Sequence, residues 1–212
     1  MNKTCWSRLT RVAATALTLG IALAGCAPLL VGGAVIGTGL VATDRRTTGT
    51  QIEDESIELK AASRARDLAT LGRINIVSYN RTVLIAGEVP GEAEKAAIEK
   101  AVAGVENVRL VVNELAVMPA TTLGTRSSDI LLGARVKATL IDAKDVHANA
   151  FKVVVERAVV YLMGRVTERE AARGADLARS VSSVQKVVRV FEILTEEQLA
   201  GLGQPQAPAA GK

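Results

Sequence analysis

The chain has 212 residues, a formal net charge of +4 and a hydrophobic fraction of 49%, of which little is aromatic. Three basic residues, Lys3, Arg8 and Arg11, stand at the N-terminus before an apolar run, and without them the charge of the rest is near +1. This balance gives little support to nucleic acid as a partner. The length is typical of one or two small domains.

The N-terminal segment is typical of a secretory signal peptide. After the basic residues comes an apolar stretch over residues 12–24, and the motif Leu-Ala-Gly-Cys ends at Cys26. This motif resembles the lipobox of bacterial lipoproteins, which implies cleavage before Cys26, a diacylglycerol on its sulfur and an acyl group on its amino terminus. We therefore predict a signal peptide over residues 1–25, a lipid anchor at Cys26 and no cofactor. The alternative is an ordinary signal peptide or membrane anchor with an incidental cysteine.

Several acyl chains together anchor a protein stably, whereas one gives only marginal binding. Ala27 follows Cys26, where an aspartate would favour retention in the inner membrane of enterobacteria. The predicted location is therefore the outer membrane, facing the periplasm. The other cysteine, Cys5, lies in the segment predicted to be removed, so we expect no disulfide.

Residues 26–52 form a predicted tether that is rich in glycine and small apolar residues. Its apolar part, residues 28–42, is shorter than the roughly 20 residues that a membrane-spanning helix needs, and its glycines weaken any helix. The sequence leaves two arrangements open, in which this part lies against the bilayer surface or packs on the folded part.

The middle of the chain contains an internal repeat. Residues 73–89 and 150–166 align without a gap at an offset of 77, and both alternate apolar residues on either side of a short polar break. This pattern predicts a β-hairpin in each copy. Gly87 and Gly164 occupy equivalent positions, where we expect a bulge or a close approach of two backbones rather than a ligand site.

Each predicted hairpin lies between two predicted helices, and the second of these helices is followed by a third strand. The helical patterns cover residues 57–68, 92–103, 130–141 and 167–181. Thr167 and Glu170 fit a capping box at the start of the last helix, and the third strands end near Val117 and Leu194. The predicted fold class is α+β, with two tandem αββαβ modules, each a three-stranded sheet with two helices on one face. Because a core of this size is marginal alone, we expect the modules to pack on each other.

Both copies resemble the BON domain, a small αββαβ module of bacterial envelope proteins. With the lipobox and the tether, the chain resembles the dual-BON-domain outer-membrane lipoproteins, and this resemblance implies binding of anionic phospholipid through the second module. The predicted parts are the signal peptide at residues 1–25, the tether at 26–52, the first BON module at 53–118, a linker at 119–127, the second BON module at 128–195 and a disordered tail at 196–212.

Charge is divided unevenly between the two modules. Residues 53–117 hold eight basic and eleven acidic side chains, and residues 128–194 hold eleven basic and eight acidic ones. A basic side chain near an anionic membrane surface contributes about 1 kcal/mol, screened by salt. We therefore expect the second module to face anionic headgroups, the alternative being ordinary solvated charge.

The helix predicted at residues 130–141 supplies the candidate lipid-binding residues. Its core face is marked by apolar residues four apart, Leu132, Val136 and Leu140. Ile130 and Leu131 fall outside that face, at the expected first turn, with Arg135 and Lys137 close by. An apolar tip beside cations suits docking into the headgroup layer. The alternative is that Ile130 and Leu131 pack against the first module.

No catalytic or metal site is predicted. The sole histidine, His147, lies in a polar stretch with Asp142 and Asp145 and has no cysteine partner, which is far more common in a solvated loop than in a metal site. The paired serines lack an accompanying base, and the paired glycines lack the strand, helix and lysine of a phosphate loop. We therefore expect a protein that is not an enzyme.

Two functions of different classes follow. The first is an outer-membrane lipoprotein that binds an anionic phospholipid membrane and supports envelope integrity, where curvature or division enriches that lipid. The second is an interaction scaffold for outer-membrane assembly proteins or the envelope stress response, which would use the exposed edges of the small sheets.

Overall fold

A computed structural model describes residues 44–69 and 71–202. The signal peptide, Cys26 and most of the tether therefore lie outside the described residues, as do the last ten residues of the tail. The described residues all belong to one compact unit. No helix among the described residues is long and apolar enough to cross a bilayer.

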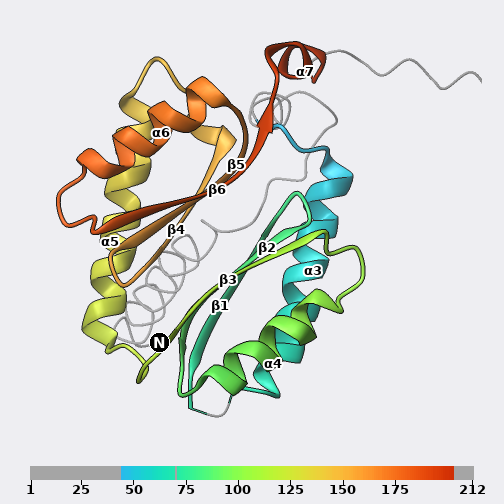
Figure 1. Cartoon of the computed structure of the whole chain (residues 1–212). Helices are drawn as coiled ribbons and strands as arrows, with labels where there is room; N and C mark the ends of the chain where they lie inside the picture. The colour runs from blue at the N-terminus through green and yellow to red at the C-terminus, as the bar shows by residue number, and fades with distance from the viewer. Residues whose placement is uncertain (1–43, 70, 203–212) are drawn as a thin grey trace, which may run out of the picture. The chain divides into compact units, whose positions relative to one another are not determined.

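The first module, called module 1, has five elements in the predicted order. They are α3 (Thr48–Arg66), β1 (Arg73–Tyr79), β2 (Thr82–Val89), α4 (Glu92–Ala103) and β3 (Leu110–Val117). Strand β2 lies in the centre of the sheet, antiparallel to β1 and parallel to β3. Both helices cover the same face of this sheet (Figure 1), which confirms the predicted architecture.

The second module, called module 2, repeats this arrangement. Its elements are α5 (Leu123–Asp142), a short 3-10 helix (Ala148–Ala150), β4 (Phe151–Glu156), β5 (Val159–Thr167), α6 (Glu168–Ser180) and β6 (Lys186–Leu194). Strand β5 is central, antiparallel to β4 and parallel to β6. The capping box predicted for Thr167 and Glu170 is present at the start of α6. A short helix α7 (Glu196–Gly201) follows.

Both hairpins close with a two-residue turn whose central residues have positive φ. These residues are Asn80 and Arg81 in module 1 and Arg157 and Ala158 in module 2, as the tight turns of two-residue hairpins require. Their amide groups point away from the hairpin and would be unpaired without an acceptor. In each module that acceptor is a buried aspartate on the first helix.

In module 1 the acceptor is Asp54, which is bonded by the Asn80 and Arg81 amides, each at 2.8 Å. In module 2 Asp129 accepts from the amides of Arg157 at 2.8 Å and Ala158 at 2.9 Å. Each aspartate therefore fixes the hairpin against the first helix of its own module.

The two glycines singled out by the repeat sit where backbones approach closely. Gly87 has a φ of +123°, and a Cβ there would clash with the carbonyl oxygen of Arg73. A Cβ at Gly164 would clash in the same way with the carbonyl oxygen of Ala150. The expected close approach is thus confirmed at both positions.

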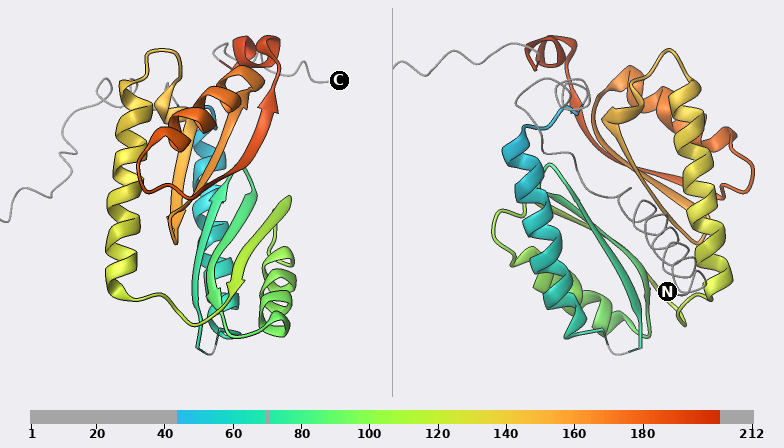
Figure 2. Two further views of the ribbon diagram at one scale, coloured as in Figure 1. Left: turned by 60° about the vertical axis from the view of Figure 1, so that its left-hand side comes forward. Right: turned by 180° about the vertical axis from the view of Figure 1, so that it is seen from behind.

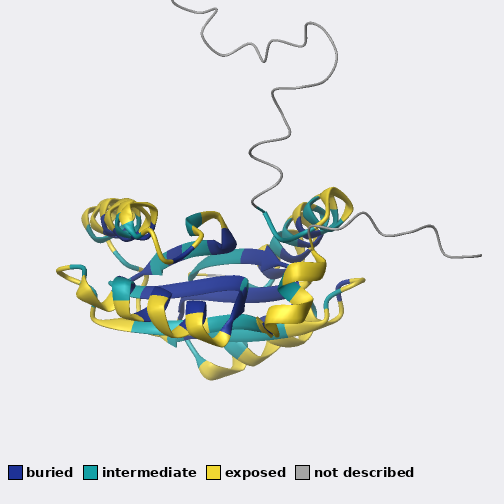
Figure 3. Ribbon diagram, turned by 90° about the horizontal axis from the view of Figure 1, so that it is seen from above, coloured by how far each residue is buried: buried dark blue, intermediate teal, exposed yellow. Residues whose placement is uncertain are grey.

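Each module has its own buried cluster, and a third cluster joins the two modules. Module 1 packs its helices on its sheet through residues such as Ile57, Ile85 and Ile98, and module 2 does so through an equivalent set. Figure 3 shows the buried residues concentrated on the strands and the exposed ones on the outer faces of the helices. The part of the chain that the structure describes from Asp44 onward therefore contains one core in each module and a third between them.

The third cluster confirms that the modules pack on each other. It lies between the sheet faces that the helices leave uncovered, and its members come from strands of both modules. They are Val77, Tyr79, Leu84, Ala86, Val154, Tyr161 and Met163, with Val112, Val159, Val188 and Val190 at its margin.

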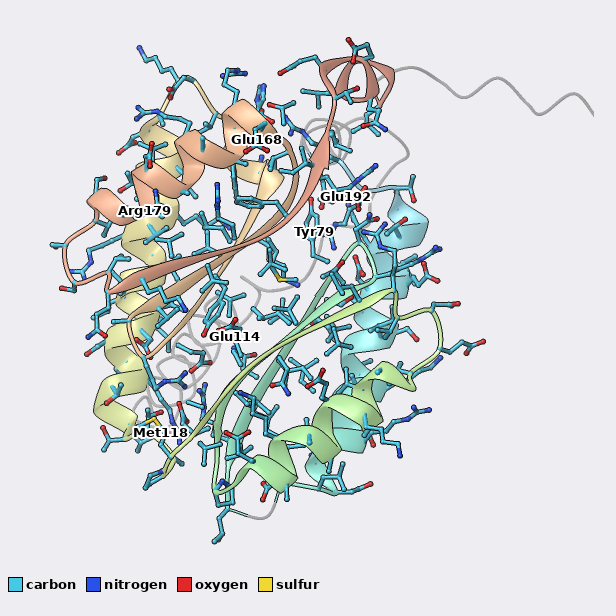
Figure 4. The ribbon with its side chains drawn as sticks, in the orientation of Figure 1. Tyr79, Glu114, Met118, Glu168, Arg179 and Glu192 are labelled. Atoms are coloured by element: carbon cyan, nitrogen blue, oxygen red, sulfur yellow. The ribbon has the colours of Figure 1, made fainter. Side chains whose placement is uncertain are left out.

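Ion pairs surround this inter-module cluster. Arg157 of module 2 bonds the fully buried Glu88 of module 1 at 2.7 Å. Near Tyr79, the Glu192 carboxylate accepts from Asn80 at 2.6 Å and from the guanidinium of Arg109 (Figure 4). These ion pairs therefore cross between the modules in both directions, with one carboxylate supplied by each module.

The segment Asp44–Arg46, called the clasp, contacts both modules. The Arg45 guanidinium bonds the Glu170 carboxylate with two nitrogens, at 2.6 and 2.7 Å. Arg46 pairs with Asp54 at 2.8 Å and lies 4.2 Å above the ring of Tyr79. The chain that leads to the tether therefore leaves the folded part at a fixed point.

Three predicted boundaries are wrong. Helix α3 begins at Thr48 and α5 at Leu123, not at residues 57 and 130, because Thr47 and Thr122 cap the helices with their side chains. Helix α5 thus takes in half of the predicted linker. The tail predicted as disordered from residue 196 begins with α7, which a capping box stabilises.

Candidate membrane-binding surface

The predicted lipid-binding residues lie on the exposed side of α5. Ile130 is 73% exposed and Leu131 is 64% exposed, and Arg135 and Lys137 are exposed as well. Since α5 begins at Leu123, the prediction that Ile130 and Leu131 lie in the first turn is wrong, and they stand in the middle of the helix. The core face is confirmed, because Leu132, Val136 and Leu140 are buried.

Two further apolar residues join Ile130, and sequence reasoning missed both. Leu123 is 77% exposed and Ile141 is 61% exposed. With 3.6 residues per turn, these two residues align with Ile130 on one side of the helix over about 27 Å. We call this line, with the exposed Ala134 and Ala138 between, the α5 stripe. Leu123 lies seven residues before Ile130 and Ile141 lies eleven after it. The helical period would therefore have predicted the α5 stripe if the helix had been known to begin at Leu123.

Basic side chains lie in and beside the α5 stripe. Lys137, seven residues after Ile130, falls in the line itself, and Arg126 lies beside it toward β4, where both line a cavity. The helical period places Leu131 and Arg135 on the other side. Figure 2 shows α5 running along the outer side of module 2. An apolar line with cations in it and beside it is typical of a helix that lies in the plane of a membrane surface.

The equivalent helix of module 1 exposes Ile52 and Leu59, but its residues at the positions of Ile130 and Leu131 are not apolar. Aligning the turn-binding Asp54 with Asp129 gives an offset of 75 between α3 and α5. At this offset, the positions of Ile130 and Leu131 are taken by Glu55 and Ser56, which are polar. The α5 stripe is therefore a property of module 2 and is not required by the fold.

A cavity of about 460 Å³ lies beside the α5 stripe. It is bounded by α5, by strand β4 and by residues of β1, including Arg73 and Asn75. Ile130, Ala134 and Lys137 belong both to the α5 stripe or its flank and to the wall of the cavity. The apolar surface and the cavity thus open onto each other.

The polar residues considered for metal binding do not gather into a site. Among the described residues, no three histidine, cysteine, aspartate or glutamate side chains lie close enough together to hold a metal ion. His147 precedes the 3-10 helix in a loop, and Asp145 is paired with Arg173 at 2.6 Å. Arg173 holds the pKa of Asp145 below its ordinary value, mainly through this hydrogen bond.

The fold and the paired sheets define two BON domains. The family model of the BON domain matches residues 54–119 and 128–195, which are the two modules described above. The chain therefore belongs to the BON-domain family, as its resemblance predicted.

Two similar proteins show more closely which kind of BON-domain protein this is. The chain is 40% identical over 184 residues to "Outer membrane lipoprotein DolP" of Haemophilus influenzae, covering 84% of this chain and 95% of that protein. It is 33% identical to the "21 kDa hemolysin" of Actinobacillus pleuropneumoniae over 70% of this chain and 78% of that protein. The predicted class and location are confirmed: this is a DolP-like outer-membrane lipoprotein with two BON domains.

Among solved structures, the chain is similar to CdsD, a structural protein of the type III secretion system of Chlamydia trachomatis. The TM-score is 0.29 at 12% identity, over 75% of this chain and 99% of that one. This likeness is too low to bear on the function.

Proposed function

We propose that this lipoprotein is acylated at Cys26 and, beyond this anchor, binds anionic phospholipid through the α5 stripe without enzymatic activity. The observation that carries the proposal is the exposure of Leu123, Ile130 and Ile141 along one line, flanked by cations. Binding of this kind supports the integrity of the envelope, where division or curvature enriches anionic lipid.

Both the apolar and the basic side chains of the proposed surface contribute to binding. Large aliphatic side chains in water gain free energy when they enter the boundary between headgroups and acyl chains. Lys137 stands in line with Ile130 and Arg135 lies on the side of Leu131, and each contributes about 1 kcal/mol near an anionic surface. Because the charge contribution is screened, binding must weaken as salt rises.

The test is flotation of the soluble part, residues 44–212, with vesicles at millimolar lipid. Phosphatidylglycerol-rich vesicles are compared with zwitterionic ones across a salt series. Wild type should float selectively with the anionic vesicles, and Ile130→Glu and Leu131→Glu should each lose at least nine-tenths of that binding. The matched control is Leu59→Glu, which places the same charge at a 74% exposed leucine of α3 and should bind as wild type does.

Equal flotation of the α5 variants and wild type would overturn the assignment to α5. Absence of flotation for the folded wild type would favour the interaction scaffold instead. The free edge of β3 supports that second candidate, because Leu110, Val117 and the adjacent Met118 are exposed there. Crosslinking from these positions in cells would then identify the protein partner.

Acylation is tested separately. Growth with labelled palmitate should label the wild-type chain, and Cys26→Ser should remove the label and release the protein from the membrane fraction. Retention of the label in Cys26→Ser would show that Cys26 is not the modified residue.

A further inference from the structure

The two modules differ at one position where the internal repeat makes them comparable. In module 1, Glu58 of α3 directs its carboxylate at the outer edge of β1, where Oε1 accepts from the Ser78 amide at 2.8 Å. The same oxygen accepts from Lys152 of module 2 at 2.8 Å. At the helix offset of 75, the position of Glu58 in module 2 is Gly133.

The amide that corresponds to Ser78 is that of Val155. Ser78 pairs with Val83 and Val155 pairs with Val160, each one step before the pair that flanks the two-residue turn. In an antiparallel hairpin such a pair does not exchange backbone hydrogen bonds, so the Val155 N–H points outward, away from β5. Among the described residues, no side chain accepts a hydrogen bond from it.

Gly133 leaves this amide accessible. The two residues face each other, since a Cβ built on Gly133 would lie 3.4 Å from Cγ2 of Val155. Both residues line the 460 Å³ cavity beside the α5 stripe. Glycine is a poor helix former in the middle of a helix, and here it keeps the cavity open.

The charges around the cavity favour an anion. Nε of Arg126 is buried and has no hydrogen-bond partner within the described part of the chain. Of the two carboxylates in the wall, Asp129 is bonded by the turn amides and Glu156 by Arg73 and Asn75. Arg126 and Lys137 are therefore not neutralised by a carboxylate among the described residues.

From these observations we infer that the cavity between α5 and β4 is a phosphate-binding site, in which a phospholipid phosphodiester accepts from the Val155 amide as the Glu58 carboxylate accepts from Ser78. This inference rests on the proposed function, because it names the headgroup site of the same surface. A lipid whose acyl chains lie against the α5 stripe brings its phosphate beside Lys137, at the mouth of the cavity. A headgroup that carries its own ammonium group meets the charges of Lys137 and Arg126, which favours anionic lipids.

The decisive variant is Gly133→Glu, which gives module 2 the carboxylate that module 1 already has. Its matched control, Gly133→Gln, has the same shape without the charge. Both replace a helical glycine, and the ordinary contact at Cβ leaves room for them, so both should fold. Urea unfolding checks this first.

The readout is the amide resonance of Val155 in the ¹⁵N-labelled fragment 44–212. The probes are dihexanoyl-phosphatidylglycerol below its micelle concentration, dihexanoyl-phosphatidylcholine and inorganic phosphate. We expect the phosphatidylglycerol to shift the Val155 resonance with an affinity at least tenfold above that of the other two probes. Gly133→Glu should weaken that binding at least tenfold, because it fills the cavity and its charge repels the phosphate. Gly133→Gln fills the same space without that charge, so it should also weaken binding, but several-fold less than Gly133→Glu.

Each contrary result overturns a different statement. If anionic vesicles bind wild type and Gly133→Glu equally, the α5 stripe remains a membrane surface and the cavity is not its headgroup site. If inorganic phosphate binds as tightly as phosphatidylglycerol, the site takes free phosphate and not a lipid. If the short-chain lipid shifts Val155 while no vesicle binds, the phosphate site stands and the proposed membrane docking fails.

Discussion

Asp54 lies almost wholly inside module 1 and nevertheless keeps its charge. Burial alone would raise the pKa of its carboxyl, but hydrogen bonds from the Arg81 amide and the Ser78 hydroxyl, with the Arg46 guanidinium, outweigh it. The pKa of Asp54 is therefore held below its ordinary value. A carboxylate in this place joins the hairpin turn, the first helix and the clasp.

This depressed pKa predicts how stability depends on acid. A group with a lower pKa in the folded state stabilises the fold above its unfolded pKa, and the contribution is lost as pH falls through the folded pKa. Asp54→Asn should therefore lower the free energy of unfolding at pH 7 by about 2–4 kcal/mol, with a smaller difference from wild type in strong acid. Urea unfolding from pH 7 to pH 3 measures both, with the exposed Glu55→Gln as control. An equal cost at every pH would contradict the argument.

At the scale of the element, one side chain at the start of α6, that of Glu170, has two roles. Glu170 closes the capping box by accepting from the Thr167 amide at 3.0 Å, and it also holds Arg45 of the clasp. Burial would raise the pKa of Glu170, but Arg45 and the Thr167 amide together hold it below its ordinary value. The clasp therefore depends on a helix cap.

Substitutions at the two ends of the capping box should have unequal effects. Thr167→Ala removes one cap bond and should cost about 1 kcal/mol. Glu170→Gln also leaves the buried Arg45 without its counter-ion, and should cost about 3 kcal/mol. Urea unfolding of both variants measures the difference, and equal small costs would show that the Arg45 pair contributes nothing.

The elements that alternate or repeat strongly could be predicted from the sequence, and the beginnings of the first helices could not. The hairpins follow from their period of two, and α6 follows from its capping box. Residues 48–52 and 123–127 contain glycine, serine and threonine, which by themselves favour turns. In these segments the side-chain caps Thr47 and Thr122 set where the helix begins. Neither cap is followed, three residues later, by the acidic or amide residue that completes a capping box.

The candidate site could be predicted only in part for the same reason. The exposure of Ile130 and Leu131 followed from the core spacing, but Leu123 lay in the predicted linker. The cavity depends on β1 of one module approaching β4 and α5 of the other, and no local pattern shows a contact between modules. The role of Gly133 emerges only when the two modules are superposed position by position.

At the scale of the whole molecule, each module contributes one tyrosine to the cluster between them. Burial raises the pKa of both Tyr79 and Tyr161 to about 12, with nearby carboxylates, Asp44 and Glu114 respectively, acting in the same direction. These are the two tyrosines of the chain. Their ionisation therefore shows whether the two modules stay packed on each other.

At high pH we expect both tyrosines to titrate as buried groups, because the two modules stay packed on each other. Absorbance at 295 nm should show both phenols ionising near pH 12 in the folded chain and near pH 10 in urea. Because the folded pKa is the higher one, the stability that these groups confer is complete below pH 10 and is lost as pH rises toward 12. Ionisation of both tyrosines near pH 10, with the circular dichroism unchanged, would mean that the modules separate in solution.

The clasp fixes how far the folded part can lie from the proposed lipid anchor at Cys26. Eighteen peptide units separate Cys26 from Asp44, and at about 3.3 Å each they reach at most about 60 Å. A surface confined to such a distance from a bilayer meets it at an effective concentration in the millimolar range. Under the proposed function, a weak intrinsic affinity of the α5 stripe is therefore enough to keep it on the membrane, and a partner that competes for this surface can still release it.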